Sequence, residues 1–320
     1  MRPLISACLL FTSLAAGQSS NPNAVRLTKF ILGVDNLDRS YAFYHALGLE
    51  LDNAKALGKP APLPDMLLKL VDVPQGTKFR NMMLKIPNTA FELEVTEFSG
   101  MDLHSAKPRI QDPGAAMLIF AVDELDAALA TAKKAGGVVL TPGGLPIEGT
   151  GRAGARAVTL KDPDGYYVQL AQPLSVRPGA GKVVGAAFGT MAVQDAEKTA
   201  SFYQDKFGFK MNDNGWTTDY DTNLGTPGAQ VHDVTVTVPG TNLSWGFFEF
   251  KGVDRKPYTP RIPDPGAAAI GLQVHDIEAA IAAMKAAGGS SITAGGSLKL
   301  GNGKVGFVRD PNGILVELAQ

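Results

Sequence analysis

Charged side chains of similar chemistry recur at equivalent places in the two halves of this 320-residue chain. Arg109 and Arg261 each follow a proline, and Arg80 corresponds to His232 when the sequence is shifted by 152 residues. A guanidinium presents a planar fork of donors that suits anionic or carbonyl ligands. We therefore treat these four as candidate ligand-binding residues. For the two prolyl-arginine sites the favoured alternative is a structural ion pair with the aspartate three residues downstream, since such a pair explains why both halves keep it.

Aromatic residues gather in the second half and form a second set of candidates. They are Trp216, Tyr220, Trp245, Phe247 and Phe248, of which Trp216, Trp245 and Phe248 are the candidate ligand contacts. Side chains alternate between the two faces of a strand, so part of this set must face away from any cavity. An ordinary core is the favoured interpretation, and a stacking pocket is the alternative.

Composition and charge exclude several classes of function. The chain has 30 Lys and Arg against 31 Asp and Glu, so it has no net positive field for nucleic acid or an anionic membrane. Its 36 Gly and 21 Pro indicate many turns, and 45% hydrophobic residues are enough for sizeable cores.

The N-terminus has the pattern of a secretory signal. Arg2 precedes an apolar run over residues 4–16 that is too short to span a bilayer, and small residues follow it. We expect residues 1–17 to be removed on export, with a buried strand or a frayed tail as the alternative. The single cysteine, Cys8, lies inside this segment, so the mature protein would have no thiol and would be secreted or periplasmic.

The chain contains an internal repeat. PRIQDPGAA at 108–116 recurs as PRIPDPGAA at 260–268, and DPDG at 162–165 recurs as DPNG at 310–313. We interpret the chain as two domains, 24–175 and 181–320, joined by the Pro- and Gly-containing PLSVRPGAGK.

Each copy also consists of two similar halves. A β-like run leads into an amphipathic helix, and three extended stretches follow. Asn36 or Asp38, and Asp195, are the expected helix N-caps. The pattern predicts a β-α-β-β-β module that occurs four times.

This arrangement resembles the vicinal oxygen chelate superfamily, which includes glyoxalases, bleomycin-resistance proteins and extradiol dioxygenases. The resemblance covers nearly all of residues 24–320 and rests on segments in a fixed order: VDNLDRSYAFY (34–44), VQDAEKTASFY (193–203), KDPDGYYVQL (161–170) and RDPNGILVEL (309–318). It implies an α+β fold in which two modules curl an eight-stranded sheet around a half-open cavity. It does not imply one particular reaction.

The resemblance also implies where a divalent metal would bind. The family places His, Gln or Glu on the first, fourth, fifth and eighth strands of a domain. In the first copy these positions hold Lys29, Glu94, Met117 and Gln169, and in the second Phe188, Gly246, Ala269 and Glu317. Only Glu94, Gln169 and Glu317 offer oxygen ligands, and a protonated lysine repels a cation. No cofactor is predicted, and a divalent metal is disfavoured.

The leading hypothesis is therefore a secreted tandem protein that binds a small organic molecule without a standard metal site. One alternative is a lyase, isomerase or dioxygenase with an unusual metal set around Glu94 and either Gln169 or Glu317. Another is a structural pseudo-dimer or interaction module with filled cavities. The sequence leaves open whether the protein is a monomeric pseudo-dimer or a homodimer.

Overall fold

The computed structural model describes residues 24–52, 58–150, 155–237 and 244–320. The predicted signal segment, residues 1–17 with Cys8, lies outside the described residues and stays a prediction. Within the described part, no helix is long and apolar enough to cross a membrane.

The described residues form four consecutive modules of one plan, as predicted. Module 1 contains β1 (Ala24–Gly33), α1 (Leu37–Ala46), β2 (Glu50–Leu51), β3 (Ala61–Pro62), α2 (Asp65–Val71), β4 (Lys78–Lys85) and β5 (Glu92–Ser99). Module 2 contains β6 (Ala116–Val122), α3 (Leu125–Lys134), β7 (Val138–Val139), a 3-10 turn (Pro142–Gly144), β8 (Ile147–Thr150), β9 (Ala155–Lys161) and β10 (Tyr167–Gln172). Module 3 contains β11 (Val183–Ala192), α4 (Ala196–Phe207), β12 (Lys210–Thr217), β13 (Gln230–Thr237) and β14 (Ser244–Lys251). Module 4 contains β15 (Ala268–Val274), α5 (Ile277–Ala286), β16 (Ser290–Ser291), β17 (Leu298–Leu300), β18 (Gly303–Arg309) and β19 (Leu315–Ala319).

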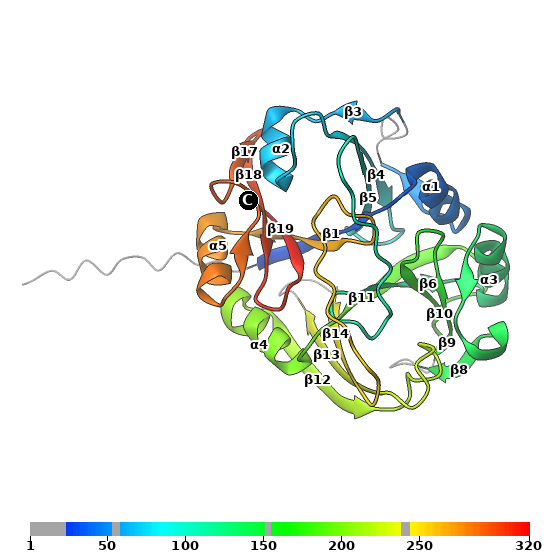
Figure 1. Ribbon diagram of the computed structural model, residues 1–320. Coiled ribbons are helices and arrows are strands. Elements are labelled where there is room, and N and C mark those ends of the chain that lie inside the picture. The colour runs from blue at the N-terminus through cyan, green and yellow to red at the C-terminus, as the bar shows by residue number, and fades with distance from the viewer. Residues whose placement is uncertain (1–23, 53–57, 151–154, 238–243) are drawn as a thin grey trace, which may run out of the picture.

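Two curled sheets, each built from two modules, make up the molecule (Figure 1). We call them sheet A and sheet B. The main path of sheet A runs β16-β18-β19-β15-β1-β5-β4-β2, and that of sheet B runs β12-β13-β14-β11-β6-β10-β9-β7. The α+β class and the eight-strand paths therefore agree with the expectation from sequence.

The partners within each sheet differ from the expectation. We expected each copy to close its own sheet, but module 1 pairs with module 4 and module 2 pairs with module 3. The central contacts are antiparallel pairs between strands of different copies, β1 with β15 and β6 with β11. The sequence repeat is thus divided between the two sheets.

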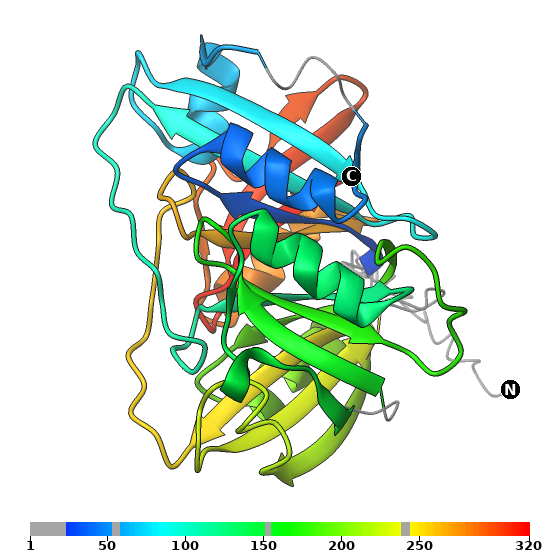
Figure 2. The same cartoon turned by 90° about the vertical axis from the view of Figure 1, so that its right-hand side faces the viewer.

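The long segment inside each copy explains this pairing. Residues 100–115 and 252–267 both cross from one sheet to the other, and Figure 2 shows them running side by side. They exchange main-chain hydrogen bonds, with Ala106 donating to Pro265 at 3.1 Å and Tyr258 donating to Pro113 at 2.7 Å. The two crossing segments are therefore tied to each other at two points instead of being free linkers.

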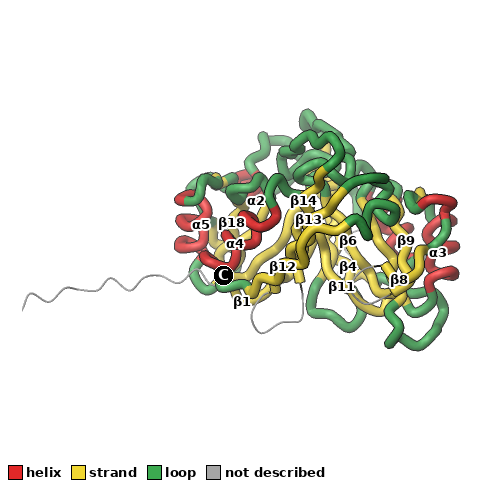
Figure 3. Tube along the Cα trace, turned by 90° about the horizontal axis from the view of Figure 1, so that it is seen from below, coloured by secondary structure: helices red, strands yellow, loops and turns green. Residues whose placement is uncertain are grey.

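The helices α1, α3, α4 and α5 pack on the convex faces of the sheets, with strands at the centre of the molecule (Figure 3). Asn36 and Asp195 cap α1 and α4, as two of the expected N-caps.

One core is shared by both sheets, and there Gly189 of β11 lies directly against the ring of Phe30 of β1. A Cβ at 189 would stand 1.9 Å from that ring, so only glycine fits this crossing.

The DPDG and DPNG turns tie the two modules of each copy together. Tyr44 of α1 donates to Asp162 at 2.7 Å, and Tyr203 of α4 donates to Asp310 at 3.0 Å. All four side chains are buried. Each sequence copy is thus held together by its helix and turn, while its strands belong to different sheets.

Candidate functional site

Three charged side chains, Lys29, Glu94 and Glu317, meet on one face of sheet A, and we call this group the floor of sheet A. Lys29 of β1 lies between Glu94 of β5 and Glu317 of β19, with its Nζ 2.7 Å from Glu94 Oε2 and 2.9 Å from Glu317 Oε1. Asn81 of β4 donates to the other Glu94 oxygen at 2.8 Å. The pairing of module 1 with module 4 creates this group, because Glu94 and Glu317 belong to different sequence copies.

The three charges are strongly coupled because they are largely buried. Burial alone disfavours the ammonium, but the attraction of Glu94 and Glu317 outweighs it and holds the pKa of Lys29 above its ordinary value. Burial also raises the pKa of Glu317, and the lysine only partly opposes this effect. Lys29 is therefore a permanent cation at neutral pH.

A glycine on the neighbouring strand makes room for the lysine. Gly271 of β15 pairs with Lys29 on one side and with Glu317 on the other. A Cβ at 271 would lie 2.7 Å from the Lys29 Cγ atom. The lysine stem thus occupies space that a side chain at 271 would need. The expected fifth-strand position, Ala269, lies two residues before Gly271 on β15, opposite Ile31.

A cavity of about 280 Å³ opens above this floor. Its polar lining consists of Lys29, Asn81, Glu94, Thr96 and Glu317, and its walls are apolar. The helix α2 supplies Leu67, Leu70 and Val71 to the lining, and β17 supplies Leu300. The volume corresponds to about nine water molecules, which is enough for a small organic molecule.

The residues at the floor do not fit a divalent metal. Lys29 holds its ammonium within hydrogen-bond distance of both carboxylates, in the position a cation shared by them would take. Among the described residues, no group of three or more His, Cys, Asp or Glu side chains is arranged to hold a metal ion. The two carboxylates already have a cation, and it is covalently part of the chain.

Gln169, the third candidate ligand, lies in sheet B and is separated from Glu94. Its amide donates to Thr159 Oγ1 at 3.2 Å, and Thr159 donates to Asn223 at 3.1 Å. The concave side of sheet B is filled by an apolar cluster that includes Ile119, Tyr167, Leu224, Phe248 and Phe250. The set of Glu94 with Gln169 is therefore not assembled.

Arg80 and His232 occupy equivalent positions, each near a glutamate that accepts a hydrogen bond from the start of a helix. Arg80 contacts Glu97 at 2.8 Å, and Glu97 accepts a hydrogen bond from the first residue of α1. His232 lies 3.9 Å from Glu249, which accepts from the first residue of α4. Arg80 thus neutralises the glutamate that binds the N-terminus of α1. The closer partner of His232 is Asp213, which lies 2.9 Å from its Nε2 atom, and neither basic residue lines the cavity of sheet A.

Arg109 and Arg261 form the structural ion pairs that were the favoured interpretation. Arg109 bonds to Asp112 at 2.8 Å, and Arg261 bonds to Asp264 at 2.6 Å. The two aspartates also accept main-chain hydrogen bonds from the opposite crossing segment, Asp112 from Lys256 and Asp264 from His104. The repeated motif therefore fastens the crossings between the sheets.

The three aromatic candidates lie in module 3 and not in the cavity of sheet A. Trp245 is 1% exposed and packs edge-on against Tyr203 in the shared core. Phe248 stacks on Tyr220 inside sheet B, and Trp216 stacks on His232 at the surface. These placements match the interpretation as core for Trp245 and Phe248.

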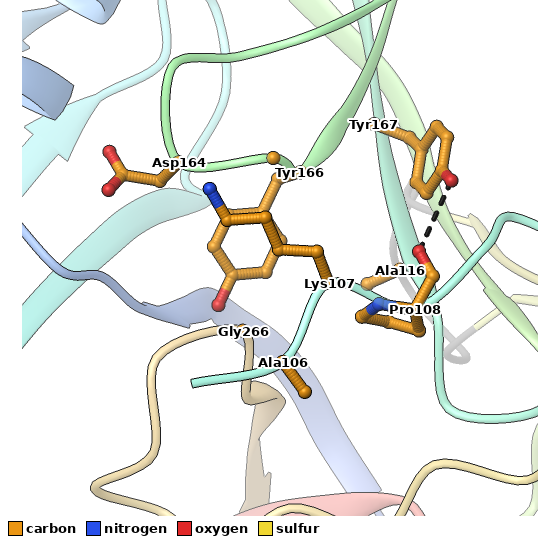
Figure 4. Close-up of a pocket in the computed structure, with 9 residues that line it drawn as sticks. Ala106, Lys107, Pro108, Ala116, Asp164, Tyr166, Tyr167 and Gly266 are labelled. Carbon is orange, nitrogen blue, oxygen red and sulfur yellow. Dashed lines mark hydrogen bonds between the residues drawn. The ribbon is translucent and has the colours of Figure 1, made fainter. Parts of the chain in front are cut away.

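A much smaller pocket lies where the two sheets meet, and Figure 4 shows it. It measures about 10 Å³, close to the minimum for a single water. The Tyr166 hydroxyl there lies 2.7 Å from Gly33 O and 2.6 Å from Ala267 O. This space is too small for a substrate and belongs to the packing between modules.

Sequence reasoning missed two parts of the site. Lys29 was excluded as a metal ligand because of its charge. The same charge was not recognised as the partner that the carboxylates of Glu94 and Glu317 need. The helix α2 was not identified, because its seven residues are too few for a clear helical period.

Comparisons with known proteins agree with this architecture. The chain is 29% identical over 132 residues to a Vibrio parahaemolyticus serotype O3:K6 protein named "Probable lactoylglutathione lyase", covering 41% of this chain and 86% of that one. Glyoxalase I from Zea mays superposes with a TM-score of 0.61 at 20% identity over 92% of both chains. A Bacillus subtilis protein described as a "putative dioxygenase" gives 0.55 at 16% identity, over 93% of this chain and 86% of that one. At these identities the two structures establish the fold alone. Residues 26–170 and 186–318 match a known family, and the chain belongs to the Glyoxalase/Bleomycin resistance protein/Dioxygenase superfamily.

Proposed function

We propose that this protein binds a small, largely apolar organic molecule in the cavity of sheet A and that it does so without a divalent metal. The observation that carries the proposal is Lys29, whose ammonium takes the cation position between Glu94 and Glu317 at the cavity floor. The apolar walls supply the binding energy through the hydrophobic effect. Export from the cell remains part of this proposal and rests on the N-terminal pattern.

The metal part is tested by elemental analysis of dialysed full-length protein. We expect far less than one equivalent of Zn, Fe, Mn, Ni or Co, and an unchanged melting temperature after chelation. Stoichiometric metal that disappears in a Glu94→Gln or Glu317→Gln variant would overturn the proposal. The matched control is Gln169→Leu, which changes the corresponding position in sheet B and should leave the metal content unchanged.

The binding part is tested by calorimetry with 1-naphthylmethanol, a bicyclic alcohol of suitable size. We expect saturable binding that is lost when Leu70→Trp fills the cavity from α2. The matching change in sheet B is Leu224→Trp, which fills no open cavity. For this variant only the folding is measured. Equal binding by a folded Leu70→Trp variant would place the ligand elsewhere.

Proton transfer is a second candidate function, favoured by Glu317. This carboxyl lines the cavity, burial raises its pKa, and an ammonium lies 2.9 Å away. The carboxylate would take a proton from the carbon next to a ketone, and Lys29 would donate a hydrogen bond to the carbonyl oxygen. Exchange of the methyl protons of 2-acetonaphthone in D₂O tests this function. Exchange that the wild-type protein accelerates and Glu317→Gln does not would support proton transfer. Exchange at the uncatalysed rate in the presence of the wild-type protein would refute it.

A further inference from the structure

The charges at the floor of sheet A select the kind of ligand. Two carboxylates, Glu94 and Glu317, face one ammonium, so the group has one negative charge in excess when both acids are ionised. Glu94 has both oxygens occupied, one by Lys29 and one by Asn81. Glu317 uses Oε1 for Lys29, and its Oε2 accepts no hydrogen bond from the described residues. The floor therefore offers a carboxylate oxygen as a hydrogen-bond acceptor for a ligand.

The walls of the same cavity are apolar up to its rim. Leu63, Leu67, Phe79, Phe98 and Phe307 line it, and none of these side chains offers a hydrogen bond. Leu300 of β17 also lines it and keeps 47% of its surface exposed. Polar recognition is thus concentrated at the floor.

We infer that the cavity selects an apolar molecule whose single polar group is a hydrogen-bond donor, cationic or neutral, and that it rejects carboxylates. This inference rests on the proposed function, since it requires the cavity to bind a ligand. A protonated amine would donate to Glu317 Oε2 and neutralise the excess charge. A carboxylate would add a second excess negative charge where the surroundings screen it poorly.

Three probes with one ring system test the inference on the wild-type protein: 1-naphthylmethylamine, which is protonated at neutral pH, 1-naphthylmethanol and 1-naphthoate. Calorimetry is the appropriate readout, since both tryptophans lie in module 3 and report poorly on this cavity. We expect the amine to bind most tightly and the carboxylate about tenfold or more weakly than the alcohol, as one repulsive charge contact of about 1.4 kcal/mol requires.

A Glu317→Gln variant should reverse this selectivity by removing the excess charge. The amine should lose about tenfold in affinity and the carboxylate should gain, while the alcohol changes little. Glu278→Gln, which removes the same charge on the surface of α5, is the matched control and should leave all three affinities unchanged.

The outcomes separate the inference from the function on which it rests. If none of the three probes binds, the proposed function fails. If all three bind equally, or if the carboxylate binds best, the cavity binds ligands but the charge selection is wrong. The wild-type comparison decides even if Glu317→Gln does not fold.

Discussion

At the scale of single residues, the decisive feature is that a side chain performs the electrostatic task of an ion. The Lys29 ammonium balances two buried carboxylates at 2.7 and 2.9 Å. Unlike a metal ion, it cannot dissociate and it leaves no open coordination position for a substrate oxygen. It offers hydrogen bonds to a ligand instead.

Replacing Lys29 by methionine should destabilise the protein in a pH-dependent way. Glu94 and Glu317 would then share a site without a cation, so one of their pKa values would rise above its unfolded value. A carboxyl with a raised folded pKa favours the fold at low pH, and that contribution is lost as the pH rises through the folded value. We expect a small loss at pH 5 and about 3 kcal/mol at pH 8, measured by urea unfolding.

The control for this prediction is Lys85→Met, which breaks a solvent-exposed pair with Asp52. Exposed pairs contribute little to stability, so the control should show no comparable dependence on pH. A Lys29→Met protein as stable as wild type at pH 8 would show that the two carboxylates do not need the ammonium.

Replacing Lys29 by histidine should create a metal site. An imidazole beside Glu94 and Glu317 would complete a set of one nitrogen and two oxygen ligands of the kind that binds zinc. We expect Zn²⁺ to raise the melting temperature of Lys29→His and to leave that of wild type unchanged in a thermal denaturation assay. An equal rise in both proteins would mean that zinc binds elsewhere.

At the scale of elements, the helix-to-turn bonds should make stability depend on pH. Burial is the main reason that the pKa of Asp162 is raised to about 6, although Tyr44 and two main-chain amides donate to it. An unfolded aspartate titrates near 3.9. The folded form holds its proton more tightly, so stability should fall by roughly 3 kcal/mol as the pH rises from about 4 to 6.

Asp162→Asn should flatten this part of the stability curve. Asparagine keeps an oxygen for the amides of Asp164 and Tyr166 and carries no charge that burial penalises. Chemical unfolding at pH 4.5 and 6.5 measures the change. Asp65→Asn, on the exposed start of α2, should keep the wild-type slope. An unchanged slope in Asp162→Asn would show that Asp162 is ionised throughout this range.

The sequence predicted the elements better than it predicted their partners. The repeated motifs identified four modules, because helix caps, glycine stops and DPxG turns are local signals. No local signal indicates whether β1 pairs with β6 or with β15, since all four leading strands are largely apolar. The composition of the site depends on that pairing: the sequence left open whether Glu94 is grouped with Gln169 or with Glu317, and the structure places it with Glu317.

At the scale of the whole molecule, neither sequence copy contains a complete sheet. Copy one, residues 24–175, carries β1 and β6, whose antiparallel partners β15 and β11 belong to copy two. An isolated copy would expose these two strands as open edges, and unpaired edges associate readily. Tyr44 and Asp162 lie in the same copy, so the helix-to-turn contact would survive the separation.

Separately expressed copies should therefore pair with another chain or fail to fold. Two molecules of copy one can complete both sheets by pairing β1 of one with β6 of the other, in the way that β1 pairs with β15 in the intact protein. We expect residues 24–180 to elute as a dimer in size-exclusion chromatography with light scattering. Mixing them with residues 181–320 should yield a one-to-one complex that recovers binding of 1-naphthylmethanol, because only the complex contains both Lys29 and Glu317. A folded monomer of either copy at micromolar concentration would contradict the division of the sheets between the copies.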